Sequence, residues 1–409
     1  MLTVEEAQAS VLAEVSLLES EDVALAEAHG RVLREDVRAP ADVPERDNSA
    51  MDGYAVRAED IAKAPGSLTV IGDLPAGTMP SISLTRGTAI RIMTGALLPD
   101  GADTVVHVEI TDGGRDLVRI EQSLARGTNV RRRGEDMRVG DVVLHSGTVI
   151  RAGELGVLAS VQQTTVRVTR RPTIAILSTG DELIDVEQPR APGKIVNANS
   201  WSLAALATEA GALPQRLGIV PDTREATVAA LERALACDFV VTSGGVSVGA
   251  WDFVKDALDA LGAETKFWRV AMKPGKPVVL STLRGCLLFG LPGNPVSSMV
   301  SFQLFVAPAI RKAMGQSGGI LPPSVTMPLA APLVSKGDRR TYMRVRVTAK
   351  RGALIAHPMR AQGSGVSTSM VGANGLAIVA EGITRIEAGG LVDVILIGPV
   401  ASGSWQSPD

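Results

Sequence analysis

Three short apolar runs in the middle of the chain each end in a loop of small, hydroxylated or proline residues. The runs are residues 173–177, 239–242 and 286–290. Ser-Thr-Gly-Asp, Ser-Gly-Gly-Val and Leu-Pro-Gly-Asn-Pro follow them directly. Buried parallel strands that bring such loops to one edge are typical of an open α/β sheet, which binds ligands at the carboxyl ends of its strands. The sequence therefore predicts an α/β domain with a ligand site at that edge.

The Ser-Gly-Gly loop is a candidate anion-binding turn. Gly244 and Gly245 let the backbone turn sharply and approach a ligand without a Cβ in the way. Their N–H groups, with the hydroxyls of Ser243 and Ser247, offer donors to an anion such as phosphate. For one such loop, an ordinary tight turn between a strand and a helix is the alternative. The convergence of three loops at one sheet edge favours a binding site.

Length, charge and cysteine content restrict the class of protein. The chain has 409 residues, which corresponds to about two to four domains, and 45% of them are hydrophobic. The formal net charge of -3 argues against a general nucleic-acid binder. Cys237 and Cys286 each stand beside an apolar run, so we expect buried free thiols rather than a disulfide. The histidines show no zinc-like spacing.

No segment is expected to direct export or to cross a membrane. The N-terminal residues are acidic and place an apolar stripe on one side of a predicted helix. That stripe consists of Val4, Ala7, Val11, Val15 and Leu18. Residues 287–310 carry no charge, but Pro, Gly and Asn interrupt them, so a buried strand, a loop and a core helix explain them better than a membrane span. We expect a cytoplasmic protein.

The chain changes character several times along its length. Residues 46–139 are rich in Gly, Thr and Val in short alternating runs, which predicts a β-rich domain. Residues 173–315 alternate strand-like and helix-like segments and form the α/β domain. After Pro322 and Pro323, alternating strands predict a small β-barrel or sandwich.

A basic cluster in the β-rich part has the composition of an oxyanion site. Arg132 and Arg133 stand beside Glu135 and Asp136. Alone, such a run is usually a solvated face or a local salt-bridge network. Beside the loops of an α/β domain we interpret it as a phosphate clamp, because each Arg offers a planar bidentate fork.

A second basic cluster lies in residues 267–277. Arg269, Lys273 and Lys276 place several cations in this short segment, and two prolines stiffen it. A surface loop is the alternative. A stiff loop would keep the ammonium groups aimed at one place, which favours an anion site.

Seven short motifs follow one another along the chain. They are Ser-Ala-Met-Asp-Gly-Tyr-Ala at 49–55, Met-Thr-Gly at 93–95, Arg-Arg-Gly-Glu-Asp at 132–136, Ser-Thr-Gly-Asp-Glu-Leu at 178–183, Ser-Gly-Gly-Val-Ser at 243–247 with Asp252, Lys-Pro-Gly-Lys-Pro at 273–277 and Leu-Pro-Gly-Asn-Pro at 291–295. In this order they resemble the molybdopterin molybdenumtransferases, a molybdenum insertase family that is also found as the C-terminal domain of gephyrin. The resemblance covers essentially the whole chain.

The resemblance implies an elongated multidomain chain of the α/β plus β class, with a Rossmann-like molybdopterin-binding domain. It also implies a homodimer with sites shared between subunits, and transient contacts with the adenylyltransferase and with molybdoenzymes. The implied domains are an N-terminal helix that packs with the α/β domain (1–22), a split elongated connector (23–45 and 140–171), a β-rich domain (46–139), the α/β domain (172–319) and a C-terminal β-barrel (320–409).

The implied reaction is hydrolysis of adenylylated molybdopterin with insertion of molybdenum from molybdate and release of AMP, aided by Mg²⁺. The residues are compatible with this chemistry, because the pyrophosphate and molybdate are anions that need cations and backbone donors. Magnesium in such sites is held by one or two carboxylates and keeps several waters.

The resemblance also assigns roles to individual residues. The catalytic positions are Asp52, Thr94, Asp136, Glu182, Asp222, Asp252, Arg269 and Lys273. The substrate-binding positions are Arg132, Arg133, Ser178, Thr179, Gly180, Asp181, Ser243, Gly244, Gly245, Val246, Ser247, Lys276, Pro292, Gly293, Asn294, Pro295 and Ser364. The Mg²⁺ ligands are Glu182, Asp222 and Asp252. Any one carboxylate could instead be a turn or helix cap, and Asp252 could cap its own helix.

Two positions depart from the family pattern, and two other functions are open. Arg269 stands where some members have Lys, and Thr223 follows Asp222 where a second Asp is common.

One alternative function is that of a molybdopterin adenylyltransferase, but the β-rich segment and the C-terminal part argue against it, because that enzyme is an α/β domain alone. The other is a gephyrin-like binding scaffold. Nothing in the sequence resembles a fused partner domain or a long linker, which argues against this alternative.

Overall fold

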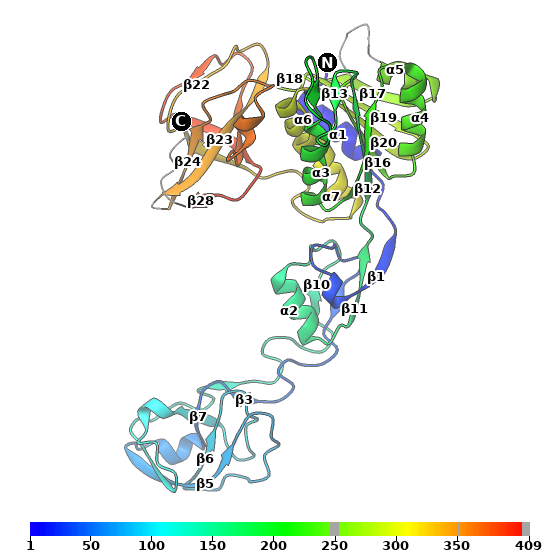
Figure 1. Ribbon diagram of the computed structural model, residues 1–409. Helices are drawn as coiled ribbons and strands as arrows, with labels where there is room; N and C mark the ends of the chain where they lie inside the picture. Colours follow the sequence, from blue (N-terminus) through cyan, green and yellow to red (C-terminus); the bar gives the residue numbers. More distant parts are fainter. Residues whose placement is uncertain (246–252, 351, 403–409) are drawn as a thin grey trace. The chain divides into compact units, whose positions relative to one another are not determined.

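The computed structural model describes residues 1–245, 253–350 and 352–402, and the chain divides into two compact units (Figure 1). Unit 1 comprises Met1–Glu35, Ser146–Arg151 and Thr165–Asp409, and unit 2 comprises Asp36–His145 and Ala152–Thr164. Unit 1 contains a mixed α/β sheet and a second sheet with few helices, while unit 2 is mostly β. The prediction of a multidomain chain of the α/β plus β class is confirmed.

A six-stranded sheet forms the centre of unit 1. Its order is β15 (Leu213–Val220), β12 (Thr173–Thr179), β16 (Phe239–Ser243), β20 (Cys286–Leu291), β19 (Pro277–Leu283) and β17 (Glu264–Arg269). The first four strands are parallel, whereas β19 is antiparallel to both β20 and β17. The three predicted strands β12, β16 and β20 are therefore neighbours, and their carboxyl ends meet at one edge.

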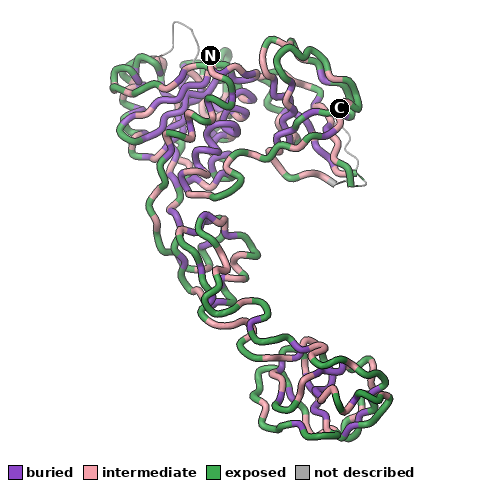
Figure 2. The backbone as a smooth tube through the Cα atoms, turned by 180° about the vertical axis from the view of Figure 1, so that it is seen from behind, coloured by how far each residue is buried: buried purple, intermediate pink, exposed green. Residues whose placement is uncertain are grey.

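Alternate residues of this sheet pack into two separate cores, as the period of two along a strand requires. Ile174 and Ile176 of β12 point to one core, and Ala175 and Leu177 point to the other. The first core includes α1 (Val4–Glu14), α3 (Asn199–Glu209), α6 (Pro295–Ser301) and α7 (Ala307–Ala313), and the second includes α4 (Arg224–Ala234) and α5 (Phe253–Ala260). Figure 2 shows the buried backbone concentrated in these central strands.

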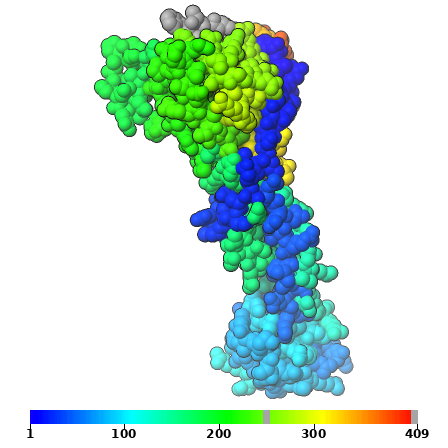
Figure 3. Space-filling model, turned by 90° about the vertical axis from the view of Figure 1, so that its right-hand side faces the viewer, coloured from blue at the N-terminus to red at the C-terminus, as the bar shows by residue number. Residues whose placement is uncertain are grey.

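The N-terminal helix is shorter than its apolar stripe predicts. A capping box starts α1, in which Thr3 Oγ1 accepts from the Glu6 N–H at 3.2 Å and the Glu6 carboxylate accepts from the Thr3 N–H at 2.8 Å. The helix ends at Glu14 because Val15 adopts an extended conformation, so including Val15 and Leu18 in the helix was wrong. Val15 is still buried in the first core, and the N-terminal residues lie against the α/β body (blue against green in Figure 3).

The long helix expected after the third strand is interrupted. Helices α6 and α7 are separated by a π-helical segment, η4, which spans Phe302–Val306. All five residues of η4 are buried, including the polar Gln303. The Gln8 side chain donates to the Leu304 carbonyl at 3.0 Å and so links α1 to this segment.

The C-terminal part of unit 1 is a seven-stranded sheet with its own core. The order β18-β23-β25-β27-β21 is extended by β24 and β28, both paired with β23. The strands are β18 (Met272–Lys273), β21 (Ser324–Pro328), β23 (Arg340–Lys350), β24 (Ala353–Pro358), β25 (Gly375–Val379), β27 (Leu391–Leu396) and β28 (Ala401–Ser402). Strand β18 belongs in sequence to the α/β part but pairs with β23, so it connects the two parts of unit 1.

Unit 2 contains a five-stranded sheet in the order β7-β4-β6-β5-β8. These strands are β4 (Gly53–Val56), β5 (Gly66–Leu74), β6 (Thr88–Ile92), β7 (Thr104–His107) and β8 (Leu117–Ile120). Two short ladders join β2 (Val37–Arg38) to β10 (Val142–Leu144) and β3 (Asn48–Ser49) to β9 (Val130–Arg131), and α2 spans Ala152–Ser160. Tyr54 and Val106 are fully buried in its core.

Candidate active site

A cavity of about 670 Å³ lies at the carboxyl ends of β12, β16 and β20, and we call it the strand-end pocket. All three predicted loops contribute to it. The predicted site residues that line it are Ser178, Thr179, Gly180, Glu182, Asp222, Ser243, Gly244, Gly245, Gly293, Asn294 and Pro295. Gly365 and Ser367, from the C-terminal part of unit 1, also line it. The structure thus brings together the loops that the sequence places far apart.

The Ser-Gly-Gly loop needs its two glycines. Gly244 and Gly245 have φ angles of 96° and 65°, which lie in the left-handed region. A Cβ on Gly244 would lie 2.8 Å from the Thr179 carbonyl oxygen, and one on Gly245 would lie 2.6 Å from Cγ2 of Val254. The backbone of this loop can therefore approach its neighbours, and a ligand, only without side chains.

Asparagine and hydroxyl groups order the floor of the strand-end pocket. The Asn199 amide donates to Ser243 Oγ at 2.8 Å and to the Gly293 carbonyl at 2.7 Å, which joins two of the loops. Ser178 Oγ lies 2.9 Å from Asn197 Oδ1. Sequence reasoning missed both asparagines, although they occur two residues apart just before a helix-like segment, where such residues commonly cap or bind.

One buried hydroxyl in this pocket has no partner among the described residues. Thr179 Oγ1 makes no hydrogen bond to any residue that the structure describes, and the same holds for Thr242 Oγ1 on the neighbouring strand. A buried hydroxyl without a partner costs about 1–3 kcal/mol. An unpaired buried hydroxyl at a pocket is consistent with a ligand that supplies the missing hydrogen-bond partner.

Two carboxylates, Glu182 and Asp222, line the strand-end pocket, and Asp181 is hydrogen-bonded to Asp222 beside it. The Asp181 N–H donates to Asp222 Oδ2 at 3.2 Å, and the Asp222 N–H donates to Asp181 Oδ1 at 3.1 Å. Burial raises the pKa of Asp222, and the charges of Asp181 and Glu182 raise it further against the hydrogen bond from Asp181. A divalent cation would relieve this repulsion, and carboxylate oxygens are the ligands that Mg²⁺ prefers.

Glu182 and Asp222 offer two carboxylates, the number with which a hard cation that keeps water ligands is commonly bound. Within the described ranges, no group of three or more His, Cys, Asp or Glu side chains is placed to hold a metal ion. The third predicted ligand, Asp252, lies outside those ranges, as do Val246 and Ser247. Thr223 caps α4 by accepting from the Ala226 N–H at 3.2 Å, so its side chain serves the helix.

A second cavity, of about 540 Å³, adjoins the first and is lined by cations; we call it the basic pocket. The predicted residues Lys273, Lys276, Pro292 and Ser364 line it. Further cations in its lining that sequence reasoning missed are Lys336, Arg339 and Arg344. The basic run at 336–340 was the available signal for the first two, whereas Arg344 stands in an alternating strand that gives none.

The cations of the basic pocket are only partly neutralised. Lys273 Nζ lies 4.0 Å from Asp338 Oδ1, and Arg339 pairs with the same carboxylate at 3.0 Å. Arg344 is almost fully buried and donates to Ser369 Oγ at 3.2 Å and to the Gly363 carbonyl at 3.1 Å. Burial lowers the pKa of Arg344 to about 10, and no carboxylate among the described residues forms an ion pair with it. The pocket therefore suits an oxyanion.

The two pockets meet at Asn294, which lines both. A loop of the C-terminal part runs past this point: Ser364 lines the basic pocket, while Gly365 and Ser367 line the strand-end pocket. The Val296 N–H, in the first turn of α6, donates to the Ser364 carbonyl at 3.1 Å and fixes this loop. In contrast, Arg269 ends β17 and lines neither of the two pockets.

In unit 2, Asp52 and Thr94 form one constellation. Asp52 Oδ1 accepts from both the N–H and the Oγ1 of Thr94, each at 2.7 Å. The hydrogen bond from the Thr94 backbone, followed by that from its hydroxyl, lowers the pKa of Asp52. The carboxylate is exposed and charged at neutral pH. Asp136 is also exposed, and its N–H donates to the Val43 carbonyl at 3.0 Å.

The two predicted clamp arginines are engaged within unit 2. Arg132 Nη1 lies 2.7 Å from Asp47 Oδ2, and Arg133 Nε lies 2.5 Å from Asp42 Oδ2. These contacts match the local salt-bridge network that was the alternative for this cluster. A phosphate clamp here stays a prediction.

The described residues contain no helix long and apolar enough to span a membrane. Cys237 and Cys286 are free and buried, as the sequence predicts.

Comparison with known proteins covers almost the whole chain. Residues 2–161 match the family described as "MoeA N-terminal region (domain I and II)", residues 175–312 match "Probable molybdopterin binding domain", and residues 326–397 match "MoeA C-terminal region (domain IV)". The chain is 40% identical over 382 residues to a molybdopterin molybdenumtransferase of Nostoc sp., with 91% of this chain and 87% of that protein covered. It is 36% identical over 397 residues to the protein of that name in Bacillus subtilis, covering 95% and 92% of the two chains.

Solved structures give the same result. The molybdopterin biosynthesis MoeA protein of Pyrococcus horikoshii superimposes with a TM-score of 0.82 at 31% identity, over 97% of this chain and 100% of that one.

Proposed function

Because the chain belongs to the molybdopterin molybdenumtransferase family, we propose that it acts in molybdenum cofactor biosynthesis as a molybdenum insertase. In this reaction it hydrolyses adenylylated molybdopterin, inserts molybdenum from molybdate into the dithiolene and releases AMP. The observation that carries the proposal is the meeting of an acidic, hydroxyl-rich pocket and a cationic pocket at Asn294.

The strand-end pocket would receive the pyrophosphate and pterin of the substrate. The backbone N–H of Gly245 and the hydroxyls of Thr179 and Ser243 line it and are suited to bind phosphate oxygens. The Gly244 N–H donates to the Leu291 carbonyl at 3.0 Å, so the expectation that it serves an anion is not met. The unpartnered Thr179 hydroxyl gains an acceptor when the substrate binds. These groups hold the anhydride in one orientation, which is the main contribution that a protein makes to phosphoryl chemistry.

Magnesium would be held by Glu182, Asp222 and Asp252. Its role would be to neutralise charge on the anhydride oxygens as that bond breaks. Asp181 would keep Asp222 in place through the reciprocal pair of backbone hydrogen bonds.

The basic pocket would bind molybdate. Lys273, Lys276 and Arg344 line it, and the buried Arg344 has no carboxylate partner among the described residues. An oxyanion in this pocket would lie close to the strand-end pocket, since Asn294 belongs to both. Arg269 is proposed only to add to the local positive charge.

We also propose a homodimer in which Asp52, Thr94 and Asp136 of one subunit complete the site of the other. The hydrogen-bonded Asp52–Thr94 pair lies in unit 2, whereas the pockets lie in unit 1. A two-fold dimer then produces two equivalent shared sites. In this arrangement residues 23–45 and 140–171 form the split connector, and the C-terminal sheet closes as a barrel. A cytoplasmic location and transient contacts with the adenylyltransferase and with molybdoenzymes complete the proposal.

Mixed dimers test the shared site. Asp52→Ala and Asp222→Ala homodimers should each be nearly inactive. In a mixed dimer one shared site carries both changes and the other carries neither, so activity should return. If heterodimers are confirmed by mass and activity does not return, each site is built within one subunit.

Release of AMP tests the reaction itself. Purified protein with Mg²⁺ should release AMP from adenylylated molybdopterin, and molybdate should stimulate that release. The same protein with molybdopterin and Mg²⁺-ATP should form no pyrophosphate. Pyrophosphate formation without AMP release from the adenylylated substrate would instead identify an adenylyltransferase.

A further inference from the structure

A third cavity, of about 480 Å³, lies in unit 1 and shares no lining residue with the two pockets described above. We call it the linker pocket, because Leu321, Pro322 and Pro323 of the segment between the α/β part and the C-terminal sheet form one wall. Helices α3 and α7 (both labelled in Figure 1) and the end of β27 contribute to the other walls. The lining is completed by Arg151, Gln303, Gln316 and Gly319.

Arg311 supplies a cation to this cavity. Its guanidinium donates to the Ile320 carbonyl at 3.2 Å, and it forms no ion pair with any described residue. Burial alone lowers the pKa of Arg311. Desolvation of a partly buried guanidinium is unfavourable, and without a carboxylate partner little electrostatic attraction within the protein offsets it.

Gln303 supplies a second polar group. It is 9% exposed, it lines the cavity, and its carboxamide makes no hydrogen bond within the described part of the chain. It lies in the π-helical segment η4, and π-helical turns frequently occur at functional sites. A guanidinium and a carboxamide in one cavity form a donor pair suited to a carboxylate or phosphate.

The remaining lining determines what else the ligand must carry. Leu206, Ala307, Leu321, Leu396 and Ile397 present apolar surface. Glu209 is exposed and forms no ion pair with Arg311. The volume falls in the range of about 300–1,000 Å³ that is usual for small-molecule sites.

We propose that the linker pocket binds a small organic anion, with its charged group on Arg311 and Gln303 and its apolar body against the linker and the end of β27. Such a ligand would touch the α/β part, the linker and the C-terminal sheet at once. The proposal is independent of the proposed reaction, because none of these residues lines either of the other pockets.

Phenyl phosphate and benzoate are the probes for this site. Calorimetric titration of the full-length protein should show saturable binding of at least one of them, whereas benzyl alcohol, which lacks the charge, and inorganic phosphate, which lacks the apolar body, should bind at least tenfold more weakly. Arg311→Met should weaken the probe at least tenfold, and Gln303→Leu should weaken it severalfold. If neither probe binds saturably, the proposal fails.

Two control variants locate the binding. Arg233→Met removes a cation from the last turn of another helix, α4, outside the cavity, and should bind the probe as the wild type does. Lys276→Met changes the basic pocket and should also leave this binding intact. Probe binding that is lost in Lys276→Met, or unchanged in Arg311→Met, would contradict the proposal.

Stability separates a binding role from a structural one. Without the probe, Arg311→Met should melt at the wild-type temperature or above it, since it removes a desolvated charge that has no partner. A melting temperature several degrees lower would show that Arg311 is kept for its bond to Ile320, and would overturn the proposal.

Discussion

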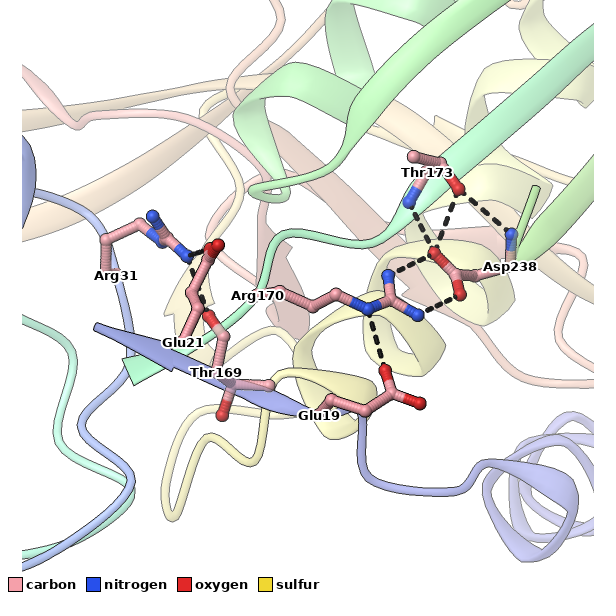
Figure 4. Close-up of polar contacts among 7 residues, drawn as sticks. All are labelled: Glu19, Glu21, Arg31, Thr169, Arg170, Thr173 and Asp238. Carbon is pink, nitrogen blue, oxygen red and sulfur yellow. Dashed lines mark hydrogen bonds and ion pairs between the residues drawn. The ribbon is translucent and has the colours of Figure 1, made fainter. Parts of the chain in front are cut away.

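The two ends of the same central strands are built in opposite ways. At the amino end, Thr173 begins β12 and Asp238 directly precedes β16, and Arg170, Asp238 and Glu19 are paired with one another (Figure 4). Arg170 donates to both oxygens of Asp238, at 2.7 and 2.6 Å, and to Glu19 at 2.7 Å. Thr173 adds its N–H and hydroxyl to the same Asp238 carboxylate, at 2.7 and 2.9 Å.

At the carboxyl end of the same strands, several groups are destabilising in the part of the chain that the structure describes. Thr179 and Thr242 have buried hydroxyls without partners among the described residues, Gly244 and Gly245 are left-handed, and the pKa of Asp222 is raised. The comparison separates stability from function along a single strand. The amino end stabilises the sheet, whereas the carboxyl end keeps groups available for a ligand.

The largest expected effect is at Asp222. Asp222→Asn should lower the rate of AMP release about 100-fold, because it removes a charge proposed to position Mg²⁺. Its unfolding free energy should not fall, since one of three repelling carboxylates is gone. Steady-state kinetics and urea unfolding measure the two quantities. Asp259→Asn, an exposed carboxylate on α5, is the control and should change neither. An Asp222→Asn variant that is destabilised but fully active would contradict the assignment of the carboxyl end to function.

Arg170→Met should have the opposite profile. It leaves Asp238 without its bidentate partner, and the pair is only partly buried, so we expect a loss of about 1–3 kcal/mol in unfolding free energy. AMP release per folded molecule should stay at the wild-type value. The neighbouring exposed Arg171→Met is the matched control and should unfold as the wild type does. A loss of turnover without loss of stability would show that the amino end also serves catalysis.

The same network predicts how stability depends on pH. Burial would raise the pKa of Asp238, but hydrogen bonds from Arg170 and Thr173 outweigh it and hold that pKa below its usual value. A lowered folded-state pKa gives stability that is fully present above about pH 4 and is lost as the pH falls through the folded value. Acid unfolding should therefore be shallower in Asp238→Asn than in the wild type. Equal slopes in the two proteins would assign the acid sensitivity to other carboxylates.

Thr179→Val tests the carboxyl end with the smallest change. The substitution replaces an unpartnered buried hydroxyl by a methyl group, so unfolding free energy should be unchanged or raised by about 0.5 kcal/mol. The Michaelis constant for adenylylated molybdopterin should rise about threefold, because the substrate loses one donor. A fall in stability would mean that the hydroxyl already serves the fold.

The sequence predicted the part of the site that follows from strand order. Apolar runs that end in Ser-Thr-Gly, Ser-Gly-Gly and Pro-Gly-Asn-Pro specify parallel strands, and parallel strands bring their carboxyl ends together. The glycines of the Ser-Gly-Gly loop were predictable for the same local reason, since only they tolerate the backbone that the loop adopts.

Contacts between distant segments were not predictable in this way. Arg344 reaches the basic pocket because β18 pairs with β23, and the sequence gives no sign of that pairing. The N-terminal stripe continues to Leu18 in sequence, but the helix stops at Glu14 because Val15 is extended. Arg132 and Arg133 illustrate a third limit, because their partners Asp47 and Asp42 lie about 90 residues away along the chain.

The most direct test of the division between the two pockets is a molybdate titration of AMP release. Lys276→Met removes a cation from the basic pocket and should raise the half-saturating molybdate concentration about tenfold, since a charge-assisted hydrogen bond contributes about 1.5–3 kcal/mol. Glu182→Gln changes the strand-end pocket and should lower the maximal rate while leaving that concentration unchanged. Lys63→Met, exposed in unit 2, is the control for loss of a positive charge. If Lys276→Met and Glu182→Gln shift the molybdate dependence equally, or if neither shifts the curve, the two pockets do not have the separate roles proposed here.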